Sequence, residues 1–472
     1  MNALTRDLIK LTDIAETQGA EKEEKLLFRE HFHLMPPVGW LNDPNGLCQF
    51  EGVYHAFFQY SPFDAEGGVK MWGHYISDNM LDWKYQGVAL YPDQPFDCHG
   101  VYSGSALVED GKMYLYYTGN VKLEDGEYDY IRTGREGNTV LVSSEDGIHF
   151  GHKKQLMRNT DYPDDLTCHV RDPKVWKEQD TYYMVQGART KEDVGQILIF
   201  TSKDKVNWKF KSRIESKEPF GYMWECPDYF TIGDKKILSA SVQGLEGGIW
   251  EERNVYQSGY FEVEGDILSS YKLGEYKLWD YGFDYYAPQS FETEDGRRIH
   301  ISWMGMPDCE AYTNLTIADG WQHCFTLPRE IYVKDGKICQ RPIRELDYKE
   351  AITKIAENKL QADSCKAYDL KIDKIQNNQF CIALAEELLL EYTDGRFRMR
   401  FTDNRKTCVS AGRDCRYVET DEVTNIRVIA DVSSVEVFVN DGEYVFSTRY
   451  YPDKYNINVQ AEGADICLAE IK

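Results

Sequence analysis

NDPNGLCQFEGVYHAFFQY, residues 42–60, carries the pattern that decides the fold. A short polar head containing Pro44 leads into a small strand. A turn at Gly52 follows, and the next strand alternates aromatic and other residues. Alternation with a period of two, bounded by glycine and aspartate turns, is typical of β-strands rather than helices. The stretch therefore predicts a β-hairpin with polar side chains at its head.

Four further stretches repeat this unit. They are SGSALVEDGKMYLYYTG from residue 103, RDPKVWKEQDTYYMVQG from 171, ECPDYFTIGDKKILSASVQG from 225 and YAPQSFETEDGRRIHISWMG from 286. The heads lie roughly 55 to 70 residues apart, as expected for a repeat architecture. One four-stranded blade cannot bury both of its faces, whereas a closed ring of blades can. Residues 28–340 are therefore predicted to form a five-bladed β-propeller; the alternative is chance similarity among β-hairpins.

The regions outside the repeat have different patterns. Residues 1–27 are predicted to form a charged amphipathic helix. Residues 341–354 are interpreted as a linker, and the overlapping segment over 349–370 looks partly helical. Residues 355–472 alternate again between Asp-Gly hairpin turns, which predicts a β-sandwich. The expected fold class is all-β, and if the chain forms a homo-oligomer, we expect the sandwich to mediate it.

Composition excludes several classes of partner. The chain has 54 Lys+Arg against 79 Asp+Glu, a formal charge of −25, which argues against nucleic acid or an anionic membrane. A small anionic substrate remains compatible, because a local basic pocket can override the average. No apolar run is long enough for a secretory signal or a membrane span. The 12 cysteines are scattered without a CxxC pair, which indicates reduced thiols, no zinc and a cytoplasmic protein.

The heads of the units are expected to meet, because the first strand of every propeller blade lines the central channel. In chain order they supply Asp43, Ser103, Ser105, Asp172 and Glu225, with Asp284 just before the fifth head. Carboxylates packed closely cannot all stay ionised, so one of them should keep its proton near neutral pH. Glu225 is the candidate, because WECPDYF, residues 224–230, places it between Trp224 and Cys226.

Two carboxyl groups on either side of a glycosidic bond are the working parts of a retaining glycosidase. Asp43 is the expected nucleophile, held ionised by backbone N–H groups of a sharp NDPNG turn. Asp172 is expected to stabilise the oxocarbenium-like state, with Arg171 orienting it. Three alternatives stay open. The carboxylates could bind Ca²⁺ or Mg²⁺, the Asp-Pro pairs could be ordinary turns, and the propeller could bind sugar without catalysis.

Aromatic and histidine residues near the heads have two readings each. Trp40, Trp72, Tyr102 and Trp224 could stack on a sugar, although tryptophans between blades more often belong to the core. The histidines at positions 33, 55 and 74 are interpreted as structural rather than as ligands.

These motifs resemble glycoside hydrolase family 32, which contains invertases, fructanases and sucrose-6-phosphate hydrolases. The similar segments are HFHLMPPVGWLNDPNG, VYSGSA, RDP, WECPD, FDYYAPQSF, WQHCFTLPRE and DVSSVEVFVNDGEYVF, in the family's order over residues 28–472. Leu41 and Tyr102 depart from the usual methionine and phenylalanine, and neither departure touches the chemistry.

The resemblance implies a propeller followed by a sandwich, and retaining hydrolysis of β-fructofuranosides without metal or cofactor. It implies Asp43 as nucleophile, Asp172 as transition-state stabiliser and Glu225 as acid/base. The implied fructosyl-binding residues are Asn42, Gln59, Trp72, Tyr102, Ser103, Arg171 and Asp284. Cys226 either modulates Glu225 or is an inert thiol.

Sucrose 6-phosphate is the expected substrate, with sucrose close behind, and fructose is the expected product. Sugars imported by a phosphorylating transporter reach the cytoplasm already phosphorylated, which favours the phosphate ester. Hydrolysis of fructans such as inulin, or fructosyl transfer to an acceptor other than water, is the alternative on the same scaffold. A related inverting arabinan-type hydrolase would share the propeller, with its carboxylates further apart to admit water.

Overall fold

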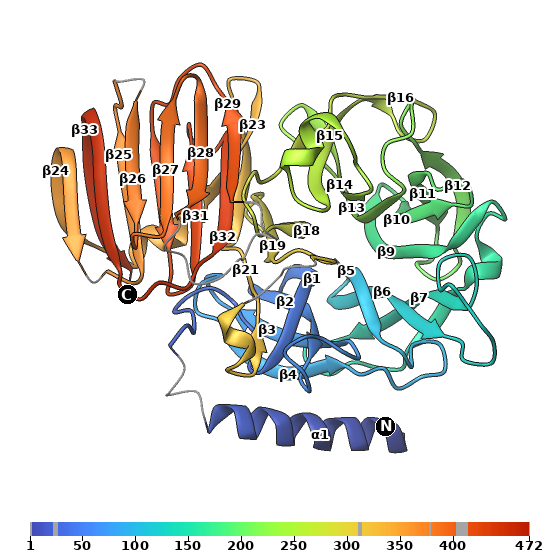
Figure 1. Ribbon diagram of the computed structural model, residues 1–472. Coiled ribbons are helices and arrows are strands. Elements are labelled where there is room, and N and C mark those ends of the chain that lie inside the picture. The colour runs from blue at the N-terminus through green and yellow to red at the C-terminus, as the bar shows by residue number, and fades with distance from the viewer. Residues whose placement is uncertain are drawn as a thin grey trace.

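The computed structural model describes residues 2–21, 27–309, 314–363, 365–376, 379–402 and 414–471. One helix, α1 (Ala3–Ala20), precedes a chain built of strands. Figure 1 shows two bodies side by side: a ring of small sheets, coloured blue to yellow, and a layered domain in orange and red. The structure confirms the predicted five-bladed β-propeller, the C-terminal sandwich-like domain and the N-terminal helix.

Each blade is an antiparallel sheet of consecutive strands. The first two blades contain β1 (Gly39–Phe50), β2 (Val53–Ser61), β3 (Met71–Ser77) and β4 (Lys84–Leu90), then β5 (Val101–Glu109), β6 (Lys112–Lys122), β7 (Arg135–Ser144) and β8 (Lys154–Met157). The third contains β9 (Leu166–Glu178), β10 (Thr181–Thr190), β11 (Gly195–Ser202) and β12 (Lys209–Ile214). The fourth contains β13 (Met223–Ile232), β14 (Lys235–Gln243), β15 (Gln257–Asp266), β16 (Ser270–Leu273) and β17 (Lys277–Leu278). The fifth contains β18 (Tyr286–Glu292), β19 (Arg298–Met304), β21 (Cys324–Phe325), β22 (Arg329–Lys334) and β23 (Lys337–Pro342).

The ring closes between its last and first blades. Strand β20 (Trp321–Gln322), near the end of the propeller, pairs in parallel with β1, and the Gly39 N–H donates to the Gly320 carbonyl at 2.8 Å. The first strands contact one another in sequence, β1 with β5, β5 with β9, β9 with β13, β13 with β18 and β18 with β1. The heads of the repeat therefore encircle one axis, as the sequence pattern predicts.

The first strand of every blade is irregular at its head. The pairing register shifts in β1 between Leu41 and Pro44, and at matching places in β5, β9, β13 and β18. Asp172, Cys226 and Ala287 have positive φ there, and a proline follows each of them. Sheets tolerate proline at bulges, and a bulge re-aims the neighbouring side chain. NDPNG, expected to be a sharp turn, is instead part of the bulged strand β1.

The C-terminal domain is one sheet of ten strands that folds back on itself. Its strands are β24 (Glu350–Asp363), β25 (Tyr368–Asp373), β26 (Phe380–Leu384), β27 (Leu388–Thr393), β28 (Arg396–Phe401), β29 (Cys415–Glu419), β30 (Ile426–Ala430), β31 (Ser434–Val439), β32 (Tyr444–Arg449) and β33 (Asn456–Ile471). Strand β33 pairs with β26 over residues 457–461 and with β25 over 465–470. Alternating apolar residues, as in β28, fill the core between the two halves.

The structure corrects one part of the linker prediction. The segment over 349–370 was predicted to be partly helical, but β24 occupies Glu350–Asp363 and pairs with β33 over its whole length. Most of its side chains are exposed, and Leu360 is the one that is buried. An edge strand held mainly by backbone hydrogen bonds has no need of apolar alternation, so its sequence lacks the signal used to find strands.

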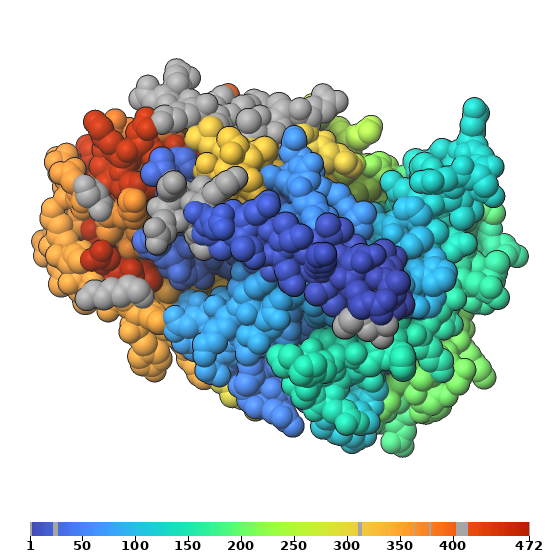
Figure 2. All heavy atoms as spheres, turned by 90° about the horizontal axis from the view of Figure 1, so that it is seen from below, coloured from blue at the N-terminus to red at the C-terminus, as the bar shows by residue number. Residues whose placement is uncertain are grey.

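Helix α1 lies along the outside of the first blade, as Figures 1 and 2 show. The Asn2 side chain caps it by accepting from the Thr5 N–H at 2.8 Å. Glu16 accepts hydrogen bonds from Tyr60 and Tyr85, at 3.1 and 2.6 Å, which attaches the helix to β2 and β4. No helix among the described residues has the length and apolar character required to cross a bilayer.

Candidate active site

Asp43 lies on β1, the first strand of the first blade, among side chains of two blades. The Asn42 amide donates to its Oδ1 at 3.1 Å, and the Gln59 amide donates to Oδ2 at 3.2 Å. The Ser103 hydroxyl, from the second blade, donates to the same Oδ2. Side-chain donors from two blades hold this carboxylate, rather than the backbone N–H groups that the sequence pattern predicts. Such donors fix the carboxylate's orientation.

Asp172 lies beside Asp43 and is almost completely buried. Its Oδ2 accepts the Cys226 backbone N–H at 2.9 Å. Burial raises the pKa of Asp172 to about 7; the Arg171 guanidinium opposes the shift, and the Glu225 and Asp43 carboxylates add to it. The protein thus holds this carboxyl group where its charge is costly, as is common at functional sites.

Glu225 has a polar environment, which corrects the expectation of an apolar one. Arg171 Nη2 lies 3.0 Å from its Oε1. The Tyr286 hydroxyl and the Gln243 amide donate to its Oε2, at 2.6 and 2.8 Å. The neighbour in sequence, Trp224, turns away and stacks on Phe261 in the core of the blade, because successive strand side chains point to opposite faces. These partners fix the plane of the carboxyl group.

Cys226 contacts the other two carboxyl groups. Its Sγ lies 3.7 Å from Oδ2 of Asp43 and 3.7 Å from Oδ2 of Asp172. Burial and the nearby carboxylates raise the pKa of this thiol well above its usual range, so it is a neutral S–H donor. The backbone at Cys226 is left-handed, and its thiol bridges Asp43 and Asp172; whether it modulates Glu225 stays a prediction.

The predicted substrate-binding residues divide into two sets. Asn42, Gln59, Ser103 and Arg171 surround the three carboxyl groups, and Tyr102 is half-buried beside them on the same strand as Ser103.

The other two predicted residues are fully buried. Trp72 lies in an apolar cluster and donates from Nε1 to the Tyr102 carbonyl at 3.1 Å. Asp284 accepts the Arg449 backbone N–H at 2.9 Å in the C-terminal domain. Their predicted contact with the fructosyl unit stays a prediction, and in this structure both side chains are enclosed by protein.

Sequence reasoning missed two residues of the site. Tyr286 lies two residues before Pro288, the same spacing that separates Glu225 from Pro227, so the repeat itself contained a signal for it. Gln243 had none, because only the pairing of Met223 on β13 with Gln243 on β14 brings its amide to Glu225.

Comparison with known proteins matches both domains. The model of the glycosyl hydrolases family 32 N-terminal domain matches residues 33–342, and that of the family's C-terminal domain matches residues 344–472. The chain belongs to glycoside hydrolase family 32. It is therefore a glycoside hydrolase, and the resemblance seen in its motifs is confirmed.

Relatives of this family 32 hydrolase cover almost its whole length. Sucrose-6-phosphate hydrolase of Bacillus subtilis is 38% identical and raffinose invertase of Escherichia coli is 38% identical, covering 94% and 93% of each chain. Sucrose-6-phosphate hydrolase of Lactobacillus gasseri has a TM-score of 0.86 at 26% identity, over 98% of this chain and 96% of that one. A Bombyx mori family 32 β-fructofuranosidase variant in complex with sucrose has a TM-score of 0.83 at 29% identity, over 98% of each.

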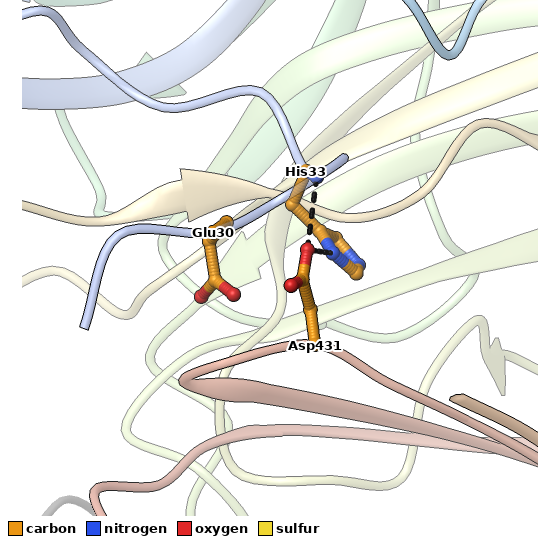
Figure 3. A group of neighbouring side chains, drawn as sticks. All are labelled: Glu30, His33 and Asp431. Atoms are coloured by element: carbon orange, nitrogen blue, oxygen red, sulfur yellow. Dashed lines mark hydrogen bonds and ion pairs between the residues drawn. The ribbon is translucent and has the colours of Figure 1, made fainter. Parts of the chain in front are cut away.

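Two further groups among the described residues of the family 32 chain have ligand-type side chains close together. Glu30, His33 and Asp431 lie where the propeller meets the C-terminal domain (Figure 3). Both ring nitrogens of His33 are engaged, Nδ1 with Asp431 at 3.0 Å and Nε2 with Glu436 at 2.9 Å. These carboxylate contacts raise the pKa of His33 to about 10 against the effect of its burial. A protonated histidine cannot bind a metal, so this group is a buried ionic link between the domains.

A second such group is also satisfied by cations. Asp347, Glu350 and Asp369 lie close together, but Arg427 Nη2 contacts all three, at 2.9, 3.0 and 2.6 Å. Lys371 adds a contact to Glu350 at 2.9 Å. The arginine and lysine provide the charge that a metal would otherwise supply, so we assign no metal to it.

Proposed function

We propose that this enzyme is a retaining β-fructofuranosidase that hydrolyses sucrose 6-phosphate and sucrose and releases fructose. The observation that carries the proposal is the gathering of three carboxyl groups from three blades. The Cys226 thiol contacts the carboxyl groups of both Asp43 and Asp172. Arg171, the residue directly before Asp172, contacts the Glu225 carboxylate. Carboxyl groups that face one sugar ring from two sides are what glycosidic bond cleavage requires.

The reaction begins when the fructosyl unit enters the mouth of the propeller. Glu225 protonates the bridging oxygen while Asp43 attacks the anomeric carbon, forming a covalent fructosyl intermediate. Glu225 then removes a proton from water, which attacks the same carbon and releases fructose with retention. Asp172 and the donors around it stabilise the positive charge that develops on the ring.

The surroundings of each group suit its role. Asn42, Gln59 and Ser103 aim the Asp43 carboxylate and prevent it from rotating. Tyr286 and Gln243 do the same for Glu225. Preorganised groups of this kind need no rearrangement during the reaction, which is the main source of catalytic power in polar sites.

Names of the relatives support the substrate. The name sucrose-6-phosphate hydrolase supports the phosphate ester as the substrate, and the name raffinose invertase supports an unphosphorylated sugar. We propose that the enzyme acts in the cytoplasm, where phosphorylated sugars remain after import. The eleven described cysteines are free thiols, in keeping with a reducing compartment.

Two substitutions test the assignment. Asp43→Ala and Glu225→Ala should each lower turnover of sucrose 6-phosphate by at least ~10³-fold, because each removes a group that forms or breaks a bond. Thermal unfolding should stay cooperative in both. Activity within about tenfold of the parent in either variant would refute the roles.

Product stereochemistry tests the retaining course. Proton NMR during the first turnovers should show the β-anomer of fructofuranose, and the α-anomer would indicate inversion. Sucrose, its 6-phosphate and inulin should be compared side by side. A clear preference for inulin would replace the proposed substrate.

We propose that the protein self-associates through the edge strand β24. Ile352 and Ile355 on this strand are 64% and 74% exposed, and a sheet edge is a template for pairing with another chain. Light scattering should give a dimer for the parent and a monomer for the Ile352→Lys/Ile355→Lys variant. A dimer in both would exclude this edge.

A further inference from the structure

Basic side chains of the second and third blades form a connected group that reaches Glu225 through Arg171. Lys122 on β6 and Arg135 on β7 are directly paired, so their side chains share a face of the sheet. Lys122 Nζ lies 5.3 Å from the centre of the Tyr130 ring. His169 contacts the Tyr130 carbonyl at 3.0 Å and Arg171 at 2.7 Å. A continuous series of contacts thus leads from Lys122 to the candidate acid/base.

Arg135 is half-buried and lacks a counter-ion. Within the part of the chain that the structure describes, no carboxylate lies within ion-pairing distance of its guanidinium, and its Nε is buried without a hydrogen-bond partner. Nearby arginines are paired: Arg132 and Arg189 both contact Asp193, at 2.8 Å each. In a chain with a formal charge of −25, an unpaired guanidinium beside the active site is unusual.

The neighbours of Arg135 do not neutralise it. Burial and the charge of Arg171 lower its pKa, while the charge of Glu225 has a smaller, opposite effect. Burial, Arg171 and Arg135 also lower the pKa of His169 to about 2, so its ring is neutral. The neutral ring accepts from Arg171 at Nδ1 and donates from Nε2 to the Tyr130 carbonyl. The site therefore has a positive charge that a bound anion could satisfy.

The position of the Arg135 charge indicates which part of the substrate it would contact. Glu225 protonates the bridging oxygen, so the departing sugar lies next to Glu225. The Glu225 charge acts to raise the pKa of Arg135, so Arg135 lies within electrostatic reach of Glu225. The Asp43 charge acts in the same way on Lys70, the basic residue stacked on Trp40 at 4.7 Å. Planar guanidinium groups bind phosphate through paired hydrogen bonds.

We propose that Arg135, with Lys122 beside it, binds the phosphate group of a phosphorylated leaving sugar. The inference rests on the proposed function, because it names how that same site recognises glucose 6-phosphate as its departing product. The proposal also gives a reason for the presence of Lys122 and Arg135 near the active site of a protein whose formal charge is −25.

Arg135→Gln tests the proposal, with Arg132→Gln as the matched control. Both variants remove one positive charge from the same blade, but Arg132 is exposed and paired with Asp193. The measured quantity is kcat/KM for sucrose 6-phosphate divided by kcat/KM for sucrose. Loss of a charge-assisted pair should lower this ratio at least ~10-fold in Arg135→Gln. The ratio should change less than about twofold in Arg132→Gln, because a surface ion pair contributes little.

Three results would overturn the proposal: an unchanged ratio in Arg135→Gln, an equal fall in Arg132→Gln, or a fall in Lys70→Gln alone. Arg135→Lys keeps the charge without the paired geometry and should give an intermediate ratio. Circular dichroism and thermal unfolding of each variant distinguish a lost contact from a lost fold.

Calorimetry separates this proposal from the proposed function. Glucose 6-phosphate should bind the parent enzyme more tightly than glucose, and Arg135→Gln should abolish the difference. If the parent hydrolyses neither sugar but shows that difference, the hydrolytic function fails and the phosphate site stands. If it hydrolyses both and binds glucose and glucose 6-phosphate equally, the phosphate site fails.

Discussion

At the scale of single residues, the site holds a carboxyl group in a buried position where its ionisation costs free energy. Asp172 is a nearly buried carboxyl group whose pKa burial raises to about 7, in contact with a neutral thiol and a backbone N–H. An aspartate with a raised folded-state pKa opposes folding once it ionises. Its unfavourable contribution is complete above pH 7 and is relieved as the pH falls toward the unfolded value of about 3.8. The residue is present for its chemistry rather than for stability.

Asp172→Asn should therefore stabilise the fold while removing activity. At pH 8 the free energy of unfolding should rise by about 1–2 kcal/mol, because the amide carries no charge to bury. Activity on sucrose should fall by at least ~10²-fold. Thermal unfolding at pH 8 and pH 5 measures the first effect. The gain should shrink at pH 5, and a loss of stability at pH 8 would contradict this account.

At the scale of elements, the bulge is the device that makes the site. Five first strands carry an irregularity at the same place, and each turns its head residues into the channel. Glycine allows the neighbouring strands to approach these heads. A Cβ on Gly187, which pairs with Arg171, would lie 2.0 Å from the Trp224 carbonyl oxygen and 3.4 Å from the Glu225 Cα. The backbone of β10 thus directly supports the strand of the candidate acid/base.

Gly187→Ala should consequently damage both stability and activity. The added methyl group must displace β13, which should cost about 1–3 kcal/mol of unfolding free energy and misplace Glu225. We expect a lower melting temperature and a fall in kcat without a matching rise in KM. Gly151→Ala is the control, because its Cβ would meet only the Ser143 carbonyl oxygen at an ordinary 3.5 Å. Equal melting temperatures for the two variants would contradict the close approach.

At the scale of the whole molecule, a buried ionic group joins propeller and sandwich. His33 contacts Asp431 and Glu436, and Glu436 also contacts Arg329 at 2.5 Å. All four side chains are fully buried. Removing one member of such a group leaves an uncompensated charge in the interior. The two domains are therefore expected to unfold together.

His33→Ala should destabilise the protein by about 3–5 kcal/mol at pH 7. The histidine has a folded-state pKa of about 10 against about 6.5 when unfolded, so its contribution is complete below pH 6.5 and is lost as the pH rises through 10. Denaturation curves from pH 6 to 10 should show the gap between parent and variant narrowing. A constant gap over this range would show that the ring is not protonated. The exposed His149→Ala, at a surface pair with Asp146, serves as the control.

The fold could be predicted from the sequence wherever a repeat unit has its own local strand-turn-strand pattern. Five hairpins with similar heads, four of them containing proline, could be recognised locally, and the ring followed because blades must bury their faces. Strand β24 escaped, because an edge strand held by backbone pairing carries no apolar alternation. The exact domain boundaries stay predictions.

Sequence alone determined the five units, the family, and the carboxyl groups that stand at the heads of three units. Each of these properties is local or repeats along the chain. The surroundings of those groups could be seen only in the folded chain. They are the donors around Asp43, the polar partners of Glu225, the contact of Asp284 with Arg449 and the unpaired charge of Arg135. The physical reason is that these contacts join residues from different strands or blades, and their geometry exists only once the ring has closed.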